Sequence, residues 1–238
     1  MNRDMKNVIV TGGTKGIGRA VIERFAQEGY EILACARNQK DLLAMEDDVQ
    51  SRFPNAKIHT FSADLSQKGQ VLAFADWVLG TVSTVDVLIN NAGVFLPGSL
   101  LEEAEGNLEL MIDTNLYSVY HLTRKLLPRM LEAKTGDIFN ICSVASLKAY
   151  TNGGSYSISK FALYGFSQNL RFELQDKGLR VISVMPGATL TASWEGVELP
   201  ESRFIKASDV AESIWSTHQL SKNTVIEDIV IRPQLGDI

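Results

Sequence analysis

Tyr156 and Lys160 stand four residues apart, so their side chains share one face if the segment is a helix. A phenol ordinarily titrates near pH ~10, and an adjacent ammonium group lowers its pKa by favouring the phenolate. Such a pair can donate or accept a proton at neutral pH. The chain's six tyrosines and its lysines give about 0.3 such pairs by chance. Packing plus a solvated lysine is therefore the alternative, and other residues must decide.

A glycine-rich segment near the start of the chain has the composition of a phosphate-binding loop. It reads Thr11-Gly12-Gly13-Thr14-Lys15-Gly16-Ile17-Gly18 and lies between an expected strand and an expected helix. Glycine permits tight turns and close approach of the backbone to a pyrophosphate, and the helix start offers unpaired N–H groups. An ordinary glycine-rich turn is the alternative. The strand before it and the helix after it favour a nucleotide site.

The elements that must position these residues alternate along the whole chain. Continuous β-branched runs such as Val8-Ile9-Val10 indicate strands covered on both faces, as in a parallel sheet. Helical patterns cover 18–28, 40–53 and a longer region over 100–133 that contains Pro128. We expect strands at 7–11, 31–35, 57–61, 85–90, 137–142, 179–185 and 224–231. This order predicts an α/β fold: a Rossmann-type, doubly wound, seven-stranded parallel sheet with helices on both faces, in a single domain over 1–238.

Composition excludes several other classes of protein. The net charge of −5 and the lack of a basic arm argue against nucleic acid as a partner. No apolar run approaches the ~18 residues that span a membrane, and the polar start does not resemble a signal peptide. Cys35 and Cys142 lie in apolar runs, which predicts buried free thiols and a cytoplasmic location. The three histidines lack metal-ligand spacing, so no metal site is expected.

The spacing of the glycines differs from the G-x-G-x-x-G of typical dinucleotide domains. Gly12, Gly16 and Gly18 form T-G-x-x-x-G-x-G, which resembles the short-chain dehydrogenase/reductase family. Ser143, thirteen residues before Tyr156, and Asn115 further upstream complete a set similar to the family's catalytic tetrad. The resemblance covers nearly the whole chain, with motifs from Thr11 to Thr191 in the family's order.

The resemblance implies a role for each member of the tetrad. Tyr156 would donate a proton when a carbonyl is reduced and accept one when an alcohol is oxidised. Lys160 would tune the phenol and hold the nicotinamide ribose hydroxyls. Ser143 would hydrogen-bond the substrate oxygen as charge develops. Asn115 would support a helix kink and hold a water in the proton relay, although an amide that satisfies backbone groups is an overlapping interpretation.

Two basic residues predict the cofactor. Lys15 lies inside the glycine loop, and Arg37 follows the second strand, where the adenosine ribose is expected. A 2′-phosphate needs positive charge there, whereas a free 2′-hydroxyl is usually held by an acidic residue. Ala36 occupies the position where NAD-preferring relatives commonly have Asp. NADP(H) is therefore expected in preference to NAD(H), and the alternative is two solvated surface cations.

Further segments resemble the family's cofactor contacts. Asp64-Leu65 would lie beside the adenine, unless Asp64 is a plain helix-start residue. Asn91-Ala92-Gly93 would pack against the adenosine, and Pro186-Gly187 with Thr189 and Thr191 would hold the carboxamide. The expected cofactor-binding residues are Gly12, Thr14, Lys15, Gly16, Ile17, Gly18, Arg37, Asp64, Leu65, Asn91, Ala92, Gly93, Tyr156, Lys160, Pro186, Gly187, Thr189 and Thr191.

The substrate is expected to be a small carbonyl or alcohol compound in an apolar, partly aromatic pocket. The tail over 227–233 is similar to bacterial sepiapterin-reductase-like members, which makes a pteridine carbonyl one candidate. Core packing accounts for the same side chains equally well. The candidate pocket residues are Phe95, Val144, Ala145, Leu147, Tyr150 and Trp194.

Two further classes of protein share part of this pattern. A catalytically silent NADP-binding redox sensor would usually lose the tetrad, which is complete here. A sugar-nucleotide epimerase or dehydratase would have a longer substrate domain and a G-x-x-G-x-x-G loop. The family resemblance also implies a homodimer or homotetramer, with the helices over 100–133 and 154–177 packing across a two-fold axis. Phe161, Tyr164, Gln168 and Phe172 near one helical face fit such a seam, and monomer-core packing accounts for them too.

Overall fold

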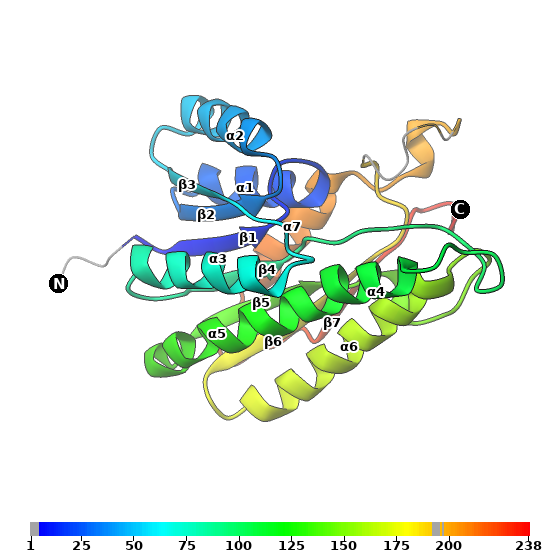
Figure 1. The fold of residues 1–238 in the computed structure, drawn as a ribbon. Coiled ribbons are helices and arrows are strands. Elements are labelled where there is room, and N and C mark those ends of the chain that lie inside the picture. Colours follow the sequence, from blue (N-terminus) through cyan, green and yellow to red (C-terminus); the bar gives the residue numbers. More distant parts are fainter. Residues whose placement is uncertain (1–4, 192–195, 197) are drawn as a thin grey trace.

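The computed structural model describes residues 5–191, 196 and 198–238, and within them the chain forms a seven-stranded parallel sheet (Figure 1). The strand order is β3-β2-β1-β4-β5-β6-β7, so the order reverses between β1 and β4, as in a doubly wound fold. The strands are β1 Asn7–Thr11, β2 Glu31–Ala36, β3 Lys57–Ser62, β4 Val87–Asn90, β5 Gly136–Ile141, β6 Leu179–Pro186 and β7 Asp228–Ile231.

Helices cover both faces of this sheet. In Figure 1, α1, α2 and α7 lie on one side of it, and α3, α4, α5 and α6 lie on the other. The helices are α1 Gly16–Gln27, α2 Gln39–Arg52, α3 Lys68–Thr81, α4 Asn107–Ile112, α5 Ser118–Ala133, α6 Gly154–Leu174 and α7 Ala207–His218. A π-helical turn, Asp113–Tyr117, joins α4 to α5, and short 3₁₀ turns occupy Val144–Ser146 and Glu201–Arg203.

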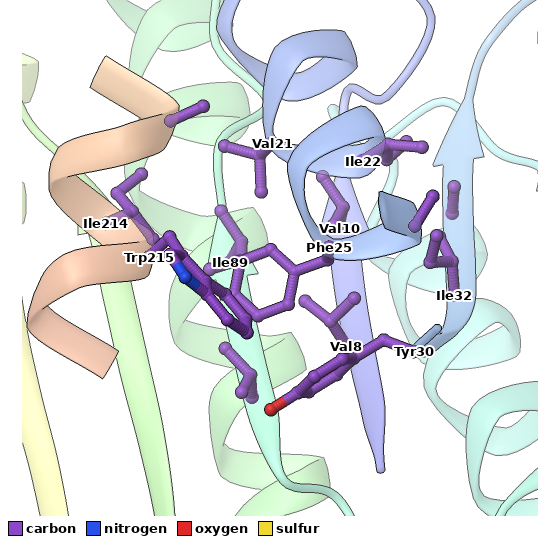
Figure 2. Packing of buried hydrophobic residues seen from close by; sticks show 14 of the residues in the cluster. Val8, Val10, Val21, Ile22, Phe25, Tyr30, Ile32, Ile89, Ile214 and Trp215 are labelled. Carbon is purple, nitrogen blue, oxygen red and sulfur yellow. The ribbon is translucent and has the colours of Figure 1, made fainter. Parts of the chain in front are cut away.

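The central strand β1 shows why its sequence is continuously apolar. Val8 and Val10 pack into the cluster under α1 and α7, whereas Ile9 packs into the cluster under α3 and α5. On the α1 side, the ring of Phe25 meets the rings of Tyr30 and Trp215 edge-on, each at 5.1 Å between centroids (Figure 2). This contact fixes α1, and with it the glycine loop at its start, against the sheet.

A buried polar cluster joins the amino ends of the strands. Asp137 of β5 accepts two hydrogen bonds from the guanidinium of Arg180 on β6, each 2.7 Å long. The Nδ1 of His218 lies 2.5 Å from the Asp137 carboxylate, and its Nε2 lies 2.9 Å from the Tyr30 hydroxyl. Burial raises the pKa of Asp137, but these hydrogen bonds outweigh burial and hold it well below its usual range.

The predicted first residues of one helix and one strand are wrong. The helix expected from residue 100 begins only at Asn107, because Gly106 takes the left-handed conformation with φ +89°. Pro128 lies inside α5 without ending it. The strand expected from Thr224 begins at Asp228, since Thr224 belongs to a turn and its carbonyl accepts a hydrogen bond from Arg180.

Other expectations concern burial. Cys35 and Cys142 are buried free thiols, as predicted. The core-packing interpretation of Phe161 and Phe172 is wrong, because 45% and 75% of these side chains are exposed on α6. No helix in the part of the chain that the structure describes is long and apolar enough to cross a membrane.

Candidate functional site

The predicted site residues gather at one edge of the sheet. The carboxyl ends of parallel strands meet at the same edge, which is where ligands bind in doubly wound folds. The glycine loop follows β1, the segment 91–93 follows β4, Ser143 follows β5, and the segment 186–191 begins at the end of β6. The sheet places these four strands side by side in the order β1-β4-β5-β6.

The glycine loop has the geometry of an anion-binding helix start. Gly12 has φ +69°, which favours glycine, and the amides of Gly12 and Gly13 donate to the Cys35 carbonyl at 2.9 and 3.2 Å. A Cβ on Gly18 would lie 2.2 Å from the Gly12 carbonyl oxygen, so only glycine fits. The loop thus turns directly into α1, whose first N–H groups face the edge where a pyrophosphate would lie.

Thr11 fixes the β4 loop against the glycine loop, a role that sequence reasoning missed. Its hydroxyl accepts hydrogen bonds from the amides of Asn91 at 2.9 Å and Ala92 at 3.0 Å. The Asn91 side chain donates in return to the carbonyls of Thr11 at 2.8 Å and Gly12 at 3.0 Å. The Asn91 amide is therefore occupied in bracing the two loops. A threonine ending the first strand before the glycines was the available signal.

The two cations that predict a phosphate site follow the neighbouring strands β1 and β2. Lys15 is the N-cap residue of α1, and Arg37 directly follows β2. Both side chains are exposed. Within 5–191, 196 and 198–238, neither forms an ion pair, whereas nearby Arg19 and Arg52 both pair with Glu23. Lys15 and Arg37 therefore have their charge available for an anion.

Asp64 and Leu65 form the turn after β3. The Asp64 carboxylate accepts from the amide of Ser66 at 3.0 Å and from its hydroxyl at 2.8 Å. The Asp64 amide donates to Gln70 Oε1 at 2.7 Å. Because α3 begins at Lys68 after an N-cap at Gln67, Asp64 is a turn residue rather than the helix start. The Leu65 side chain belongs to the core, so only its backbone is left to contact a ligand at this edge.

Tyr156 and Lys160 lie on the first two turns of α6. The Lys160 Nζ is 5.7 Å from the centre of the Tyr156 ring, and it donates to the Ile141 carbonyl at 2.8 Å. Burial raises the pKa of Tyr156 to about 12, which a hydrogen bond with Ser143 partly opposes. Burial lowers the pKa of Lys160 to about 8. The pKa of the phenol is therefore raised, not lowered as the sequence predicts, because desolvation has the largest effect on it.

Ser143 is held by a capping box on the 3₁₀ turn after β5. Its hydroxyl oxygen accepts the Ala145 amide at 3.1 Å, and its own amide donates to the Ser146 hydroxyl at 3.3 Å. These contacts use an acceptor position of the Ser143 hydroxyl and leave its single proton to face Tyr156.

Asn115 lies fully buried in the π-helical turn, a feature that frequently marks functional sites. Its Oδ1 accepts the Val94 amide at 2.8 Å, and its Nδ2 donates to the Val94 carbonyl at 3.0 Å and the Ser159 hydroxyl at 2.9 Å. Asn115 is thus an amide that satisfies backbone groups, as the overlapping interpretation expects. Ser159 was missed by sequence reasoning, and its place directly before Lys160 was the available signal.

Gly93 and Thr191 connect the loops around the site. A Cβ on Gly93 would lie 3.1 Å from Asn115 Oδ1 and 3.6 Å from Lys160 Nζ, so the β4 loop touches the tetrad. A Cβ on Gly16 would lie 2.9 Å from the Thr191 methyl carbon, so the β6 loop touches the glycine loop. Gly187 instead lies beside the C-terminal tail, where a Cβ would be 3.1 Å from Pro233.

The remaining residues of the cofactor set and the pocket candidates divide by burial. Thr14 and Ile17 are half-buried, with Ile17 packed on the core, and the hydroxyl of buried Thr189 donates to the Gly187 carbonyl at 3.0 Å. The ring of Phe95 meets that of Tyr156 edge-on at 4.8 Å. Ala145 is buried, Val144 is half-buried, and Leu147 and Tyr150 are exposed. Trp194 lies outside the described residues.

Comparison with known proteins gives relatives of nearly the same length. A sepiapterin reductase from Chlorobaculum tepidum is 30% identical, with 98% of this chain and 99% of that protein covered. An NADP-dependent 3-hydroxy acid dehydrogenase of Escherichia coli is 29% identical, with 95% and 94% covered. The structure of a metagenomic short-chain oxidoreductase in complex with NADP is 28% identical, covers 96% and 97%, and superposes with a TM-score of 0.84.

The family model for short chain dehydrogenases matches residues 6–201, which include the glycine loop, the tetrad positions and the segment after β6. Together with the doubly wound sheet and the relatives over the full length, this match shows that the chain belongs to the short-chain dehydrogenase/reductase family.

Proposed function

We propose that the chain is an NADPH-dependent oxidoreductase that transfers a hydride between the nicotinamide and a small carbonyl or alcohol substrate, with Tyr156 as general acid/base. One observation carries the proposal. At one edge of the sheet, the glycine-lined start of α1 lies near buried Lys160 and half-buried Tyr156. The NADP-dependent dehydrogenase and the NADP-bound oxidoreductase among its relatives support the cofactor.

The residues present fit a dinucleotide phosphate. The close approach at Gly18 leaves no side chain there, so a pyrophosphate would meet the backbone of the loop. Lys15 and Arg37 would hold the 2′-phosphate, and a guanidinium can bind it through two parallel hydrogen bonds. Asp64 and the Leu65 backbone would contact the adenine, and Lys160 would contact the nicotinamide ribose. When bound, the dinucleotide supplies or receives the hydride.

The chain's own residues handle the proton. In reduction, the Tyr156 hydroxyl donates its proton to the substrate oxygen as negative charge develops there. The Ser143 hydroxyl donates its hydrogen bond to the same substrate oxygen and so stabilises the negative charge that develops there. The Lys160 ammonium favours the phenolate that remains on Tyr156. In oxidation the same groups act in reverse.

A turnover screen tests this proposal. NADPH and NADH consumption are followed with small ketones, diketones, quinones and pteridines. We expect turnover with NADPH, and we expect Tyr156→Phe to lower kcat by about 100- to 10,000-fold, the usual contribution of a positioned acid/base. Undiminished turnover of Tyr156→Phe contradicts the mechanism. Equal or better use of NADH contradicts the assignment of Lys15 and Arg37. Binding of NADPH without turnover of any substrate favours a redox sensor.

A pteridine carbonyl is the second candidate substrate, because the sepiapterin reductase relative is 30% identical over the full length. The rings of Phe95, which meets Tyr156 edge-on, and of exposed Tyr150, which interacts with Tyr156, suit a planar substrate. A higher kcat/KM for pteridines than for simple ketones is the expected result under this assignment.

We also propose a homodimer or homotetramer formed through α5 and α6. The exposed rings of Phe161 and Phe172 support it, since such rings are usually covered in the working assembly. Static light scattering at micromolar concentration should give a dimer or tetramer mass, and a monomer mass contradicts the proposal. The proposed location is the cytoplasm, in keeping with the buried free thiols of Cys35 and Cys142.

A further inference from the structure

The loop between β4 and α4, residues 91–106, contacts the first turn of α6 directly beside Tyr156. The hydroxyl of Ser155 donates to Glu103 Oε1, and the amide of Ser155 donates to Glu103 Oε2 at 3.4 Å. Ser155 is only 1% exposed, so its hydroxyl has little access to water. Glu103 therefore supplies the acceptors that this buried residue needs.

This contact lies at the start of α6. Its N-cap residue is Gly153, whose side chain is a hydrogen atom and offers no oxygen to the first amides. A carboxylate near a helix N-terminus is favoured by the helix dipole and by the unpaired N–H groups there. Glu103 comes from a different part of the chain and takes the place of the missing cap.

Two further contacts hold the same loop on the same turn. The Gly98 amide donates to the Asn152 carbonyl at 3.0 Å. A Cβ on Gly154 would lie 2.4 Å from the Gly98 carbonyl oxygen, so the close approach requires glycine there. Among the described residues, hydrogen bonds that leave the stretch 95–106 end on 152–155, apart from those that begin α4.

We propose that Glu103 is a positioning residue, which fixes the first turn of α6 and thereby places the Tyr156 hydroxyl against Ser143. The inference rests on the proposed function, since it assigns to Glu103 the placement of the proposed acid/base. The loop acts on Tyr156 from two sides, because Glu103 holds the preceding residue while the Phe95 ring packs on the phenol. Neither contact brings Glu103 to the reacting atoms.

Three variants test the proposal in the full-length protein. We expect Glu103→Ala to lower kcat by about tenfold, because small misplacements of a reacting group cost rates of this order or more. Glu103→Gln keeps one acceptor for the Ser155 hydroxyl but loses the charge and the second acceptor. Its kcat should therefore lie between those of the wild type and Glu103→Ala. Glu102→Ala is the matched control, since Glu102 is the exposed neighbour in the same loop. NADPH affinity should stay within about twofold in all three, because the glycine loop is untouched.

The pH dependence of kcat for alcohol oxidation separates positioning from a direct charge effect. The groups that face Tyr156 are Ser143 and Cys142 at the end of β5, Lys160 on α6, and Tyr150 before α6. If Glu103→Ala displaces the phenol from Ser143, the phenolate loses a partner, and the limb of the profile on which kcat rises with pH moves to higher pH. If the Glu103 carboxylate acted through its charge, its removal would move that limb to lower pH. A lower or unchanged limb overturns the proposal.

Hydrogen exchange keeps the proposal testable apart from turnover. We expect Glu103→Ala and Gly154→Ala to raise deuterium uptake in peptides covering 96–106 and 152–160, with the rest of the chain unchanged. Unchanged uptake at 152–160 overturns the proposal even if kcat falls. If Tyr156→Phe retains full turnover, the proposed function fails, and this exchange measurement still decides whether Glu103 fixes the start of α6.

Discussion

Burial opposes charge on both of the side chains that we propose to move the proton. It raises the pKa of Tyr156 to about 12 and lowers that of Lys160 to about 8. Each shift favours the neutral form, which is what desolvation does to an acid and to a base. At mildly alkaline pH both side chains are therefore mostly uncharged, and the ammonium form of Lys160 predominates below pH about 8.

This shift of Lys160 predicts a pH-dependent stability difference from Lys160→Met. Between pH about 8 and about 10.5 the unfolded chain binds a proton that the folded chain does not, so stability rises with pH there. The penalty for burying charged Lys160 is complete below pH about 8 and lost by pH about 10.5. Wild type should therefore gain up to about 3 kcal/mol relative to Lys160→Met between these values.

Urea unfolding of both proteins at pH about 7.5 and pH about 11, on either side of this window, measures that gain. The comparison is made between the two proteins at each pH, so other groups that titrate in this range cancel. A difference that stays constant contradicts the lowered pKa of Lys160.

At the scale of elements, the loops after β1 and β4 are held as one unit. Thr11 and Asn91 take part in four hydrogen bonds between the loops, and Gly18 lets the start of α1 close on Gly12. A Cβ on Gly18 would meet both the Gly12 carbonyl oxygen at 2.2 Å and the Asn91 side-chain nitrogen at 2.5 Å, so the backbone and the bracing amide would both have to move. The site is therefore more sensitive to small changes in the loops than to changes on the helix surfaces.

Gly18→Ala should weaken NADPH binding by at least about tenfold, because the new methyl group meets the Gly12 carbonyl oxygen at 2.2 Å and must open the loop. Isothermal titration with NADPH measures this. Gly80→Ala on α3 is the matched control, since a Cβ there has no heavy atom within 4 Å among the described residues. It should leave binding unchanged and stabilise the helix by about 0.5–1 kcal/mol. Normal binding by Gly18→Ala contradicts the proposed pyrophosphate site.

Sequence patterns predicted the strands of the sheet well where burial is complete. The run Val8-Ile9-Val10 is apolar on both faces because helices cover both, whereas a strand with one wet face would alternate apolar and polar residues. The start of α4 was misjudged, because leucines at helical spacing over 100–110 are largely exposed and Gly106 turns the chain. A hydrophobic pattern does not reveal which apolar residues stay on the surface.

Part of the candidate site was also beyond sequence reasoning. The tetrad and glycine positions follow from motif order. Three contacts do not, because they join residues 21 to 81 positions apart in the sequence: Thr11 with the loop after β4, the Asn115 amide with Val94, and Glu103 with Ser155. Such pairs are set by the packing of loops in space. The direction of the Lys160 ammonium, toward the Ile141 carbonyl, likewise depends on how α6 lies on β5.

At the scale of the whole molecule, the two edges of the sheet have different tasks. The carboxyl edge holds the proposed chemistry, whereas the amino edge holds the cluster of Asp137, Arg180, His218 and Tyr30. The lowered pKa of Asp137 contributes stability above the unfolded pKa of ~3.9, and this stability is lost as the pH falls toward the folded pKa. Protonation of Asp137 in acid should therefore lower the free energy of unfolding.

Asp137→Asn should destabilise the fold by about 3 kcal/mol, because it leaves the Arg180 guanidinium buried without a counter-charge. The kcat of the folded fraction should be unchanged, since the cluster lies at the edge opposite the proposed site. Urea unfolding together with assay below the transition checks both statements, with exposed Asp47→Asn as the control. A large fall in kcat without loss of stability contradicts this division of tasks.

The reversal of strand order between β1 and β4 also separates, along the sequence, the residues proposed to set cofactor choice from those proposed to transfer the proton. The residues proposed to face adenosine all lie at or before Gly93, whereas those proposed to move the proton follow Asp113. The two sets meet only because the sheet brings β1 and β4 together. A single recombination between these halves can thus exchange cofactor choice while leaving the proton chemistry whole, so the two traits can diverge independently.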